Sequence, residues 1–91
     1  MHGKMLTLGL LKNAYEGCAR VGIITSRRVG PATVRTALRR KLREIVRLAR
    51  PRIQPGVWMV IITKAPATRV SYAALASEWT QLARRGGVLA E

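Results

Sequence analysis

The 91-residue sequence has one cysteine, one histidine and four acidic residues, and each scarcity excludes a class of function. With Cys18 alone, no internal disulfide or thiolate metal cage can form, which fits a reducing compartment such as the cytoplasm. General acid–base catalysis needs a group that titrates near neutrality or a pair of carboxylates, but His2 stands beside the chain end and the four glutamates are far apart. No apolar run approaches the roughly 18 residues of a membrane span. We therefore expect no active site, no metal site and no membrane span in this chain.

Positive charge, by contrast, is abundant. The sequence has seventeen lysine and arginine residues and only four acidic residues, which gives a formal net charge of +13. Such an excess destabilises a compact chain through self-repulsion, so we expect a polyanionic partner, first of all a nucleic acid. Hydrophobic residues make up 48% of the sequence, which predicts a folded chain, and its length suits one domain. The composition therefore predicts a single domain over residues 1–91 that binds a nucleic acid.

Five segments carry the pattern of a strand or a helix. They follow one another as strand, strand, helix, strand, helix: residues 5–11, 19–26, 31–50, 56–63 and 71–85. The first two predict a hairpin closed by a turn at 13–17, and the apolar run GVWMVIIT predicts a central strand covered on both sides. Pro31 and Pro51 bound the long helix, and Ser71 caps the last one. The order ββαβα predicts the α+β class, a small two-layer α/β sandwich with one layer of helices.

The long helix carries two surfaces. A wheel of 100° per residue places one apolar face toward a core: Val34, Leu38, Leu42, Ile45 and Ala49. The adjoining arc, here called the arginine face, consists of Arg35, Arg39, Arg40, Arg43, Arg47 and Arg50. Ten of the seventeen basic residues lie between Arg27 and Arg52, against the single acid Glu44. Solvated helix faces commonly mix charges of both signs, so a face that is nearly all arginine predicts binding to the phosphates of a structured RNA.

The residues around this helix resemble a known family. Segment 29–44 is similar to the signature helix of the bacterial ribonuclease P protein subunit, in which a Val-Gly-x-Ala opening precedes an Arg-Asn-Arg triplet, a basic pair and an Arg-Glu. The matching positions are Val29, Gly30, Ala32, Arg35, Arg39, Arg40, Arg43 and Glu44. Arg20-Val21-Gly22 upstream and Lys64-Ala65-Pro66 downstream also look like the family, so the resemblance covers about residues 4–85.

The resemblance implies that this chain does not cut RNA itself. In that family the partner RNA holds magnesium and carries out the hydrolysis of the endonuclease ribonuclease P. The protein stabilises the catalytic RNA and aids binding of precursor tRNA for removal of the 5′ leader. The implied partners are therefore ribonuclease P RNA and precursor tRNA in the cytoplasm, with no small-molecule substrate, no membrane and no cofactor bound by the protein.

The same resemblance, together with the charge pattern, names the residues expected at the site. Those expected to bind RNA are Arg27, Arg28, Arg35, Thr36, Arg39, Arg40, Arg43 and Arg47. Trp58 is expected on a sheet face that holds the leader. Trp79 repeats at helical spacing with Leu75 and Leu82, so core packing is the expectation there. No residue is expected to be catalytic or to bind a metal.

The sequence departs from the family pattern in two places. Thr36 and Ala37 stand where the triplet usually has Asn and Arg, so Arg35 alone is carried over from it, and Thr36 keeps one hydroxyl for a hydrogen bond. Family members also usually open with a further helix that carries aromatic residues, whereas this sequence begins near the strand that follows it. A shortened chain, a start that lies further upstream and a divergent homologue are all compatible with that beginning.

Three alternatives to this function stand beside it. A divergent homologue or related-fold module would bind other structured RNA without ribonuclease P activity. An amphipathic helix on an anionic membrane would need the apolar face of segment 31–50 to be free. A protein-only nuclease would need a metal site that this composition does not supply.

Overall fold

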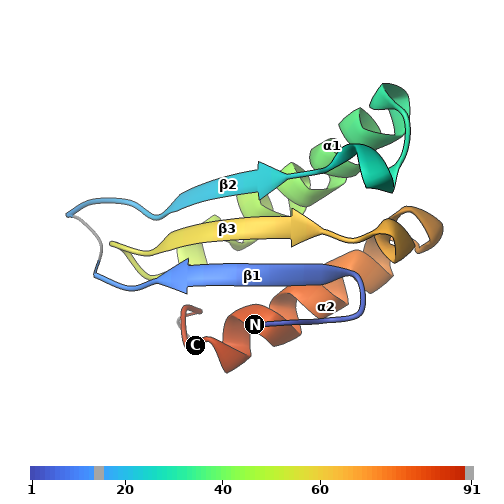
Figure 1. Cartoon of the computed structure of the whole chain (residues 1–91). Helices are drawn as coiled ribbons and strands as arrows, with labels where there is room; N and C mark the ends of the chain where they lie inside the picture. Colours follow the sequence, from blue (N-terminus) through green and yellow to red (C-terminus); the bar gives the residue numbers. More distant parts are fainter. Residues whose placement is uncertain (14–15, 90–91) are drawn as a thin grey trace.

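The computed structural model describes residues 1–13 and 16–89, which form a three-stranded sheet and two helices (Figure 1). The regular elements are β1 (Leu6–Leu11), β2 (Arg20–Ile24), α1 (Ala32–Ala49), β3 (Trp58–Thr63) and α2 (Tyr72–Arg85). Short 3₁₀ turns lie between them: η1 (Arg27–Val29), η2 (Arg50–Arg52) and η3 (Ala65–Arg69). The order ββαβα and the α+β class predicted from the sequence are confirmed.

Local sequence signals set the ends of both helices. Pro31 is the N-cap of α1, and Pro51 follows directly after its C-cap, where the missing N–H of proline ends the α-helical hydrogen bonds and the chain continues into η2. The Oγ of Ser71 accepts a hydrogen bond from the backbone N–H of Ala74 at 3.2 Å, as expected of an N-cap serine. At the other end of α2, Gly87 has a φ of +69°, a conformation that glycine adopts without strain. The predicted helix boundaries are thus correct to within one or two residues.

The strand pairing differs from the predicted hairpin. The sheet order is β1-β3-β2, so β3 lies between the first two strands, antiparallel to β1 and parallel to β2. The hairpin prediction is wrong because the apolar β3 takes the central position and pairs along both of its edges. The chain passes from β2 to β3 through α1, as a parallel pair requires a long crossover. Within the predicted turn at 13–17, residues 14 and 15 lie outside the described residues.

Both helices lie behind the same face of the sheet (Figure 1). On that face Met59 and Ile61 of β3 are completely buried, and Trp79 of α2 packs into the same core, as predicted. Trp58 and Ile62, which point to the opposite face of the same strand, are 51% and 40% exposed. The expectation that β3 is covered on both sides is therefore wrong for the described residues, because their helices form a single layer.

The apolar face of α1 lies in this core. Its buried residues are Leu38, Leu42, Ile45, Val46 and Ala49, and Val34 near the start of the helix is half-buried. That burial directs the opposite side of α1 away from the sheet and toward solvent. It also removes the apolar surface that the membrane alternative needs.

Candidate RNA interface

The solvent side of α1 carries the residues that the sequence predicted for RNA binding. Arg40, Arg43 and Thr36 are exposed, whereas Arg35 and Arg39 are half-buried along the border with the core. Within the part of the chain that the structure describes, neither Arg40 nor Arg43 has a hydrogen-bond or ion-pair partner. Their guanidinium groups are therefore available to an external anion.

One acid interrupts this surface. Glu44 accepts hydrogen bonds from Nε and Nη2 of Arg47, at 2.9 and 2.6 Å, one turn further along α1. The hydrogen bond from Arg47 lowers the pKa of the Glu44 carboxyl, and the same contact raises the pKa of Arg47. Both groups are consequently charged at neutral pH, and the pair neutralises one positive charge of the arginine face.

Arg39 is held in place by a residue from outside the helix. Its Nε donates a hydrogen bond to Oγ1 of Thr25 at 2.9 Å. Thr25 follows the end of β2 and is only 8% exposed, so this hydroxyl is a fixed acceptor. The hydrogen bond occupies Nε and leaves the two terminal nitrogens of Arg39 for a ligand. Thr25 was not among the residues predicted for the site, because no local pattern relates it to a residue 14 positions away.

Arg35 and the basic turn η1 complete the predicted set. The Nε of Arg35 is buried and has no hydrogen-bond partner within the described residues. Arg27 and Arg28 are exposed on η1, directly before α1. Because η1 packs against η3, the exposed Arg69 belongs to the same end of the molecule. Arg69 was not among the predicted residues, since only the tertiary contact relates it to α1.

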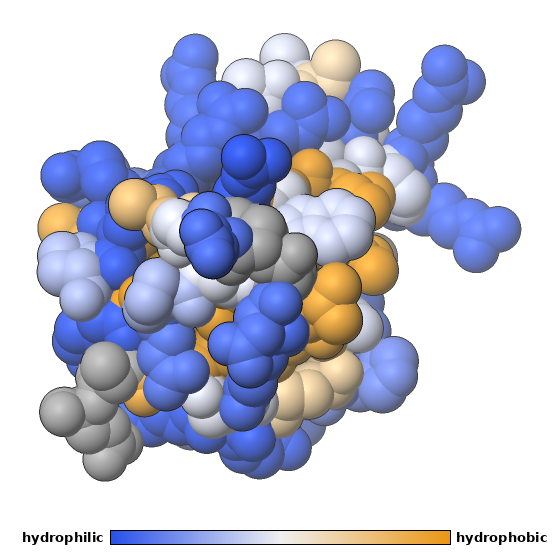
Figure 2. Space-filling view, turned by 90° about the vertical axis from the view of Figure 1, so that its left-hand side faces the viewer, coloured by the Kyte–Doolittle hydropathy of each residue, from blue (hydrophilic) through white to orange (hydrophobic). Residues whose placement is uncertain are grey.

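The sheet face opposite the helices, here called the open sheet face, forms a second surface. The strand register places three cross-strand rows on it: Leu11, Trp58 and Arg20; Gly9, Val60 and Gly22; Thr7, Ile62 and Ile24. Its large apolar residues Leu11, Trp58 and Ile24 are 51–53% exposed. Figure 2, which views the molecule from the left-hand end of Figure 1, shows this face in profile, with hydrophobic side chains between hydrophilic ones. Trp58 thus lies on the sheet face that the helices of the described chain leave uncovered.

The middle cross-strand row of the open sheet face has little side-chain volume, because two of its three residues are glycines. A Cβ added at Gly22 would meet nothing within 4 Å, and one added at Gly9 would meet only Val60, at 3.9 Å or more. Both glycines therefore leave space beside Val60, between the Trp58 row and the Ile62 row. A flat ligand has room to lie across the sheet at this level.

Among residues 1–13 and 16–89, no group of three or more His, Cys, Asp or Glu side chains is placed to hold a metal ion. In that same part of the chain, no helix has the length and apolarity needed to cross a membrane.

The family model for ribonuclease P matches residues 1–87 of this chain. The chain belongs to the ribonuclease P protein family. It is 40% identical over 86 residues to the ribonuclease P protein component of Roseiflexus castenholzii, covering 93% of this chain and 70% of that protein. With the ribonuclease P protein component of Symbiobacterium thermophilum it shares 37% identity over 80 residues, which is 88% of this chain and 70% of that protein. The resemblance seen in the helix motif is thereby confirmed over nearly the whole chain.

Solved structures of ribonuclease P proteins share the fold. The RNase P protein from Thermotoga maritima superposes with a TM-score of 0.83 at 27% identity, covering 93% of this chain and 80% of that one. For the RNase P protein from Staphylococcus aureus the TM-score is 0.88 at 18% identity, with coverage of 98% and 81%. The predicted fold is therefore that of a ribonuclease P protein.

Proposed function

We propose that this chain acts as the protein subunit of ribonuclease P and binds the catalytic RNA through α1 and η1. The observation that carries the proposal is the geometry of α1: its apolar side is buried against the sheet, and its other side presents arginines with a single acid among them. Membership of the ribonuclease P protein family supplies the partner. Guanidinium groups bind phosphate oxygens bidentately, so such a surface holds an RNA backbone by shape and charge.

The contacting set is proposed to be the one expected from the sequence. It consists of Arg27, Arg28, Arg35, Thr36, Arg39, Arg40, Arg43 and Arg47. Arg40 and Arg43 have no partner within the described residues, so they give up no internal bond on binding. Arg39 is already oriented by its hydrogen bond to Thr25 before RNA binds, so less side-chain entropy is lost when the complex forms. Thr36, exposed beside them, contributes a hydroxyl where the family motif has an amide.

The open sheet face is proposed to bind the 5′ leader of precursor tRNA. Trp58 is half-exposed there and offers an aromatic plane, and stacking platforms of this kind bind single strands without strict sequence preference. The neighbouring row of Gly9, Val60 and Gly22 leaves space for the strand to lie flat. The catalytic RNA is proposed to hold the magnesium ions and to perform the cleavage, in the cytoplasm, while this chain positions both RNAs.

Reconstitution with a bacterial ribonuclease P RNA at low magnesium tests the proposal. The chain is expected to restore cleavage of precursor tRNA, and Arg40→Gln is expected to weaken that rescue. Binding that involves about six phosphates should lose roughly three orders of magnitude of affinity between 50 and 200 mM salt. Arg40→Gln should reduce the slope of log K against log salt by about 1. The matched control is Arg85→Gln, which removes an exposed arginine from the last turn of α2, away from α1.

Two results would contradict this function. Retained binding to structured RNA without rescue of cleavage would favour the alternative of a module for other RNA. An equal loss of slope in Arg40→Gln and Arg85→Gln would show that net charge, not the arginine face, determines binding.

A further inference from the structure

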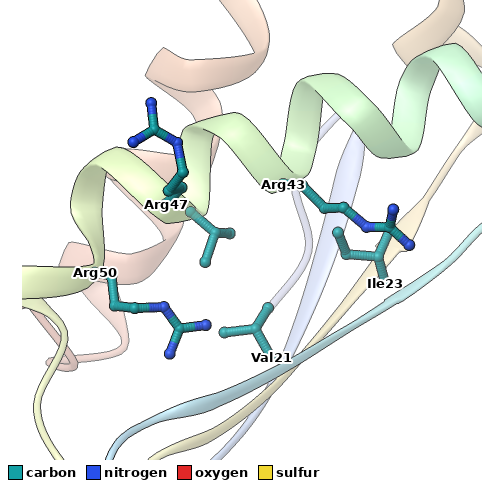
Figure 3. A pocket seen from close by; sticks show the side chains of 6 residues that line it. Val21, Ile23, Arg43, Arg47 and Arg50 are labelled. Atoms are coloured by element: carbon teal, nitrogen blue, oxygen red, sulfur yellow. The ribbon is translucent and has the colours of Figure 1, made fainter.

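A cavity of about 380 Å³ lies between the second half of α1 and the edge strand β2. Its apolar lining comes from Val21 and Ile23 of β2 and from Val46 of α1, and Arg43, Arg47 and Arg50 surround it (Figure 3). Its volume falls within the range of small-molecule sites, roughly 300–1,000 Å³. We call it the arginine pocket.

The pocket exists because the helices do not close over β2. Val21 and Ile23 pair with Met59 and Ile61 and therefore point to the helix side of the sheet. Met59 and Ile61 are completely buried there, whereas Val21 and Ile23 are only half-buried. The apolar floor of the pocket is consequently left uncovered by the described chain, directly beside the arginine face.

Two arginines bound the pocket at its ends. In Figure 3 the Arg43 side chain extends to Ile23, and the Arg50 side chain extends toward Val21, while Arg47 points away. Nη1 of Arg50 is fixed by a hydrogen bond of 3.0 Å to the carbonyl of Ala19. Arg43 and Arg50, the C-cap of α1, are seven positions apart, which corresponds to about 10 Å along the helix axis. A ligand on the floor is therefore flanked by a guanidinium at each end.

The edge of β2 adds hydrogen-bonding groups. The backbone N–H of Arg20 donates to the carbonyl of Val57 at 2.9 Å, so Arg20 and every second residue after it turn toward β3. Val21 and Ile23 occupy the alternate positions, and their backbone N–H and C=O groups are directed outward, at the border of the pocket. Donors and acceptors thus stand beside an apolar floor and two cations.

A ligand that matches all of these features has a flat aromatic group, a polar edge on that group and an attached anion. A nucleotide has all three. We propose that the arginine pocket receives one unpaired nucleotide of the bound RNA, with the base on Val21, Ile23 and Val46 and its flanking phosphates on Arg43 and Arg50. Arginine planes stack on bases, and unstacked bases of RNA loops and bulges are the usual targets of such sites. The inference rests on the proposed function, because it places the nucleotide within the RNA held by the arginine face.

Two RNA hairpins with the same stem test the pocket, one blunt and one with a single bulged 2-aminopurine. The wild-type chain is expected to bind the bulged hairpin about tenfold more tightly, and the 2-aminopurine fluorescence is expected to change on binding. Val21→Phe fills the pocket and should abolish both effects while leaving affinity for the blunt hairpin unchanged. Leu48→Phe adds the same ring to an exposed position of α1 and should behave as wild type.

A charge variant gives an independent readout if Val21→Phe does not fold. Arg50→Gln should remove most of the preference for the bulge, whereas Arg52→Gln, an exposed arginine two residues further on, should retain it. Equal affinity of wild type for the two hairpins would overturn the pocket proposal but leave the proposed function standing, since binding of the blunt hairpin and rescue of cleavage test that separately. Displacement of the bulged hairpin by micromolar adenosine monophosphate would identify a site for free nucleotides and would also refute the proposal.

Discussion

Replacing Glu78 of α2 is expected to destabilise the fold more than any other single change to a glutamate at a described position. Its carboxylate accepts three backbone N–H groups at the entry to β1: Lys4 at 3.0 Å on Oε1, and Met5 and Leu6 at 2.8 Å each on Oε2. Gly3 allows this approach, because a Cβ at that position would lie 2.7 Å from the Glu78 Cδ. One side chain thereby fixes the start of an edge strand to a helix.

The loss of unfolding free energy in Glu78→Ala depends on which of these three hydrogen bonds water can replace. Lys4 is exposed, so its N–H finds water in Glu78→Ala, whereas the bonds of Met5 and Leu6 are partly buried. At about 1.5 kcal/mol for each of these two bonds to a charged acceptor, the alanine variant should lose about 3 kcal/mol of unfolding free energy. For a domain of this size that corresponds to a fall in Tm of about 12–24 °C.

Thermal and urea unfolding followed by circular dichroism measure this loss. Glu78→Gln should cost less than alanine, because a carbonyl oxygen at the Oε2 position still accepts from Met5 and Leu6. Glu44→Ala is the matched control, since it removes the same charge from an exposed side chain, and its Tm should stay near that of wild type. The reasoning is refuted if Glu78→Ala unfolds at the temperature of the control, or if glutamine is worse than alanine.

Three further changes test the two binding surfaces. Glu44→Gln should raise affinity for structured RNA by roughly two- to tenfold at low salt in filter binding, because it removes the negative charge that pairs with Arg47 and leaves that arginine only a weaker, neutral acceptor. The lowered pKa of Glu44 means that its pair with Arg47 is intact at neutral pH and is lost as the pH falls through that pKa. The small difference in Tm between wild type and Glu44→Gln that such an exposed pair gives should therefore be constant from about pH 8 to 5 and vanish in stronger acid. Thr25→Val should weaken RNA binding by about two- to tenfold in the same assay, because Arg39 loses its fixed orientation. Trp58→Ala should reduce the preference for precursor over mature tRNA by about tenfold in competition binding, because a base loses its stacking partner.

Two of these changes have a control, and the third has a result that would contradict it. Thr63→Val removes another buried threonine hydroxyl, which donates to the carbonyl of Ile24 at 3.2 Å, and it should alter stability without altering RNA affinity. Equal effects of the two threonine variants on RNA binding would contradict a positioning role for Thr25. For Trp58→Ala the internal control is mature tRNA, whose affinity should not change. Unchanged RNA affinity in Glu44→Gln at low salt would show that Arg47 does not reach the phosphates.

The sequence by itself determined the elements and the chemistry of α1. Proline and serine act on the backbone within a few residues, so three of the four helix ends were readable from Pro31, Pro51 and Ser71. The helical period separated a core side from an arginine side for the same local reason, and the motif it carries named the family. Alternation along β3 placed Trp58 and Met59 on opposite faces, but it did not say which of them the helices cover.

Only the tertiary structure decided the long-range pairings. β2 pairs with β3 instead of β1 because a central apolar strand gains more by pairing on both edges than a hairpin gains from a short connection. The contacts of Arg39 with Thr25, of Arg50 with Ala19 and of Glu78 with Leu6 join residues 14, 31 and 72 positions apart. Such contacts depend on where whole elements settle against one core, and no pattern within a single segment of the chain encodes that placement.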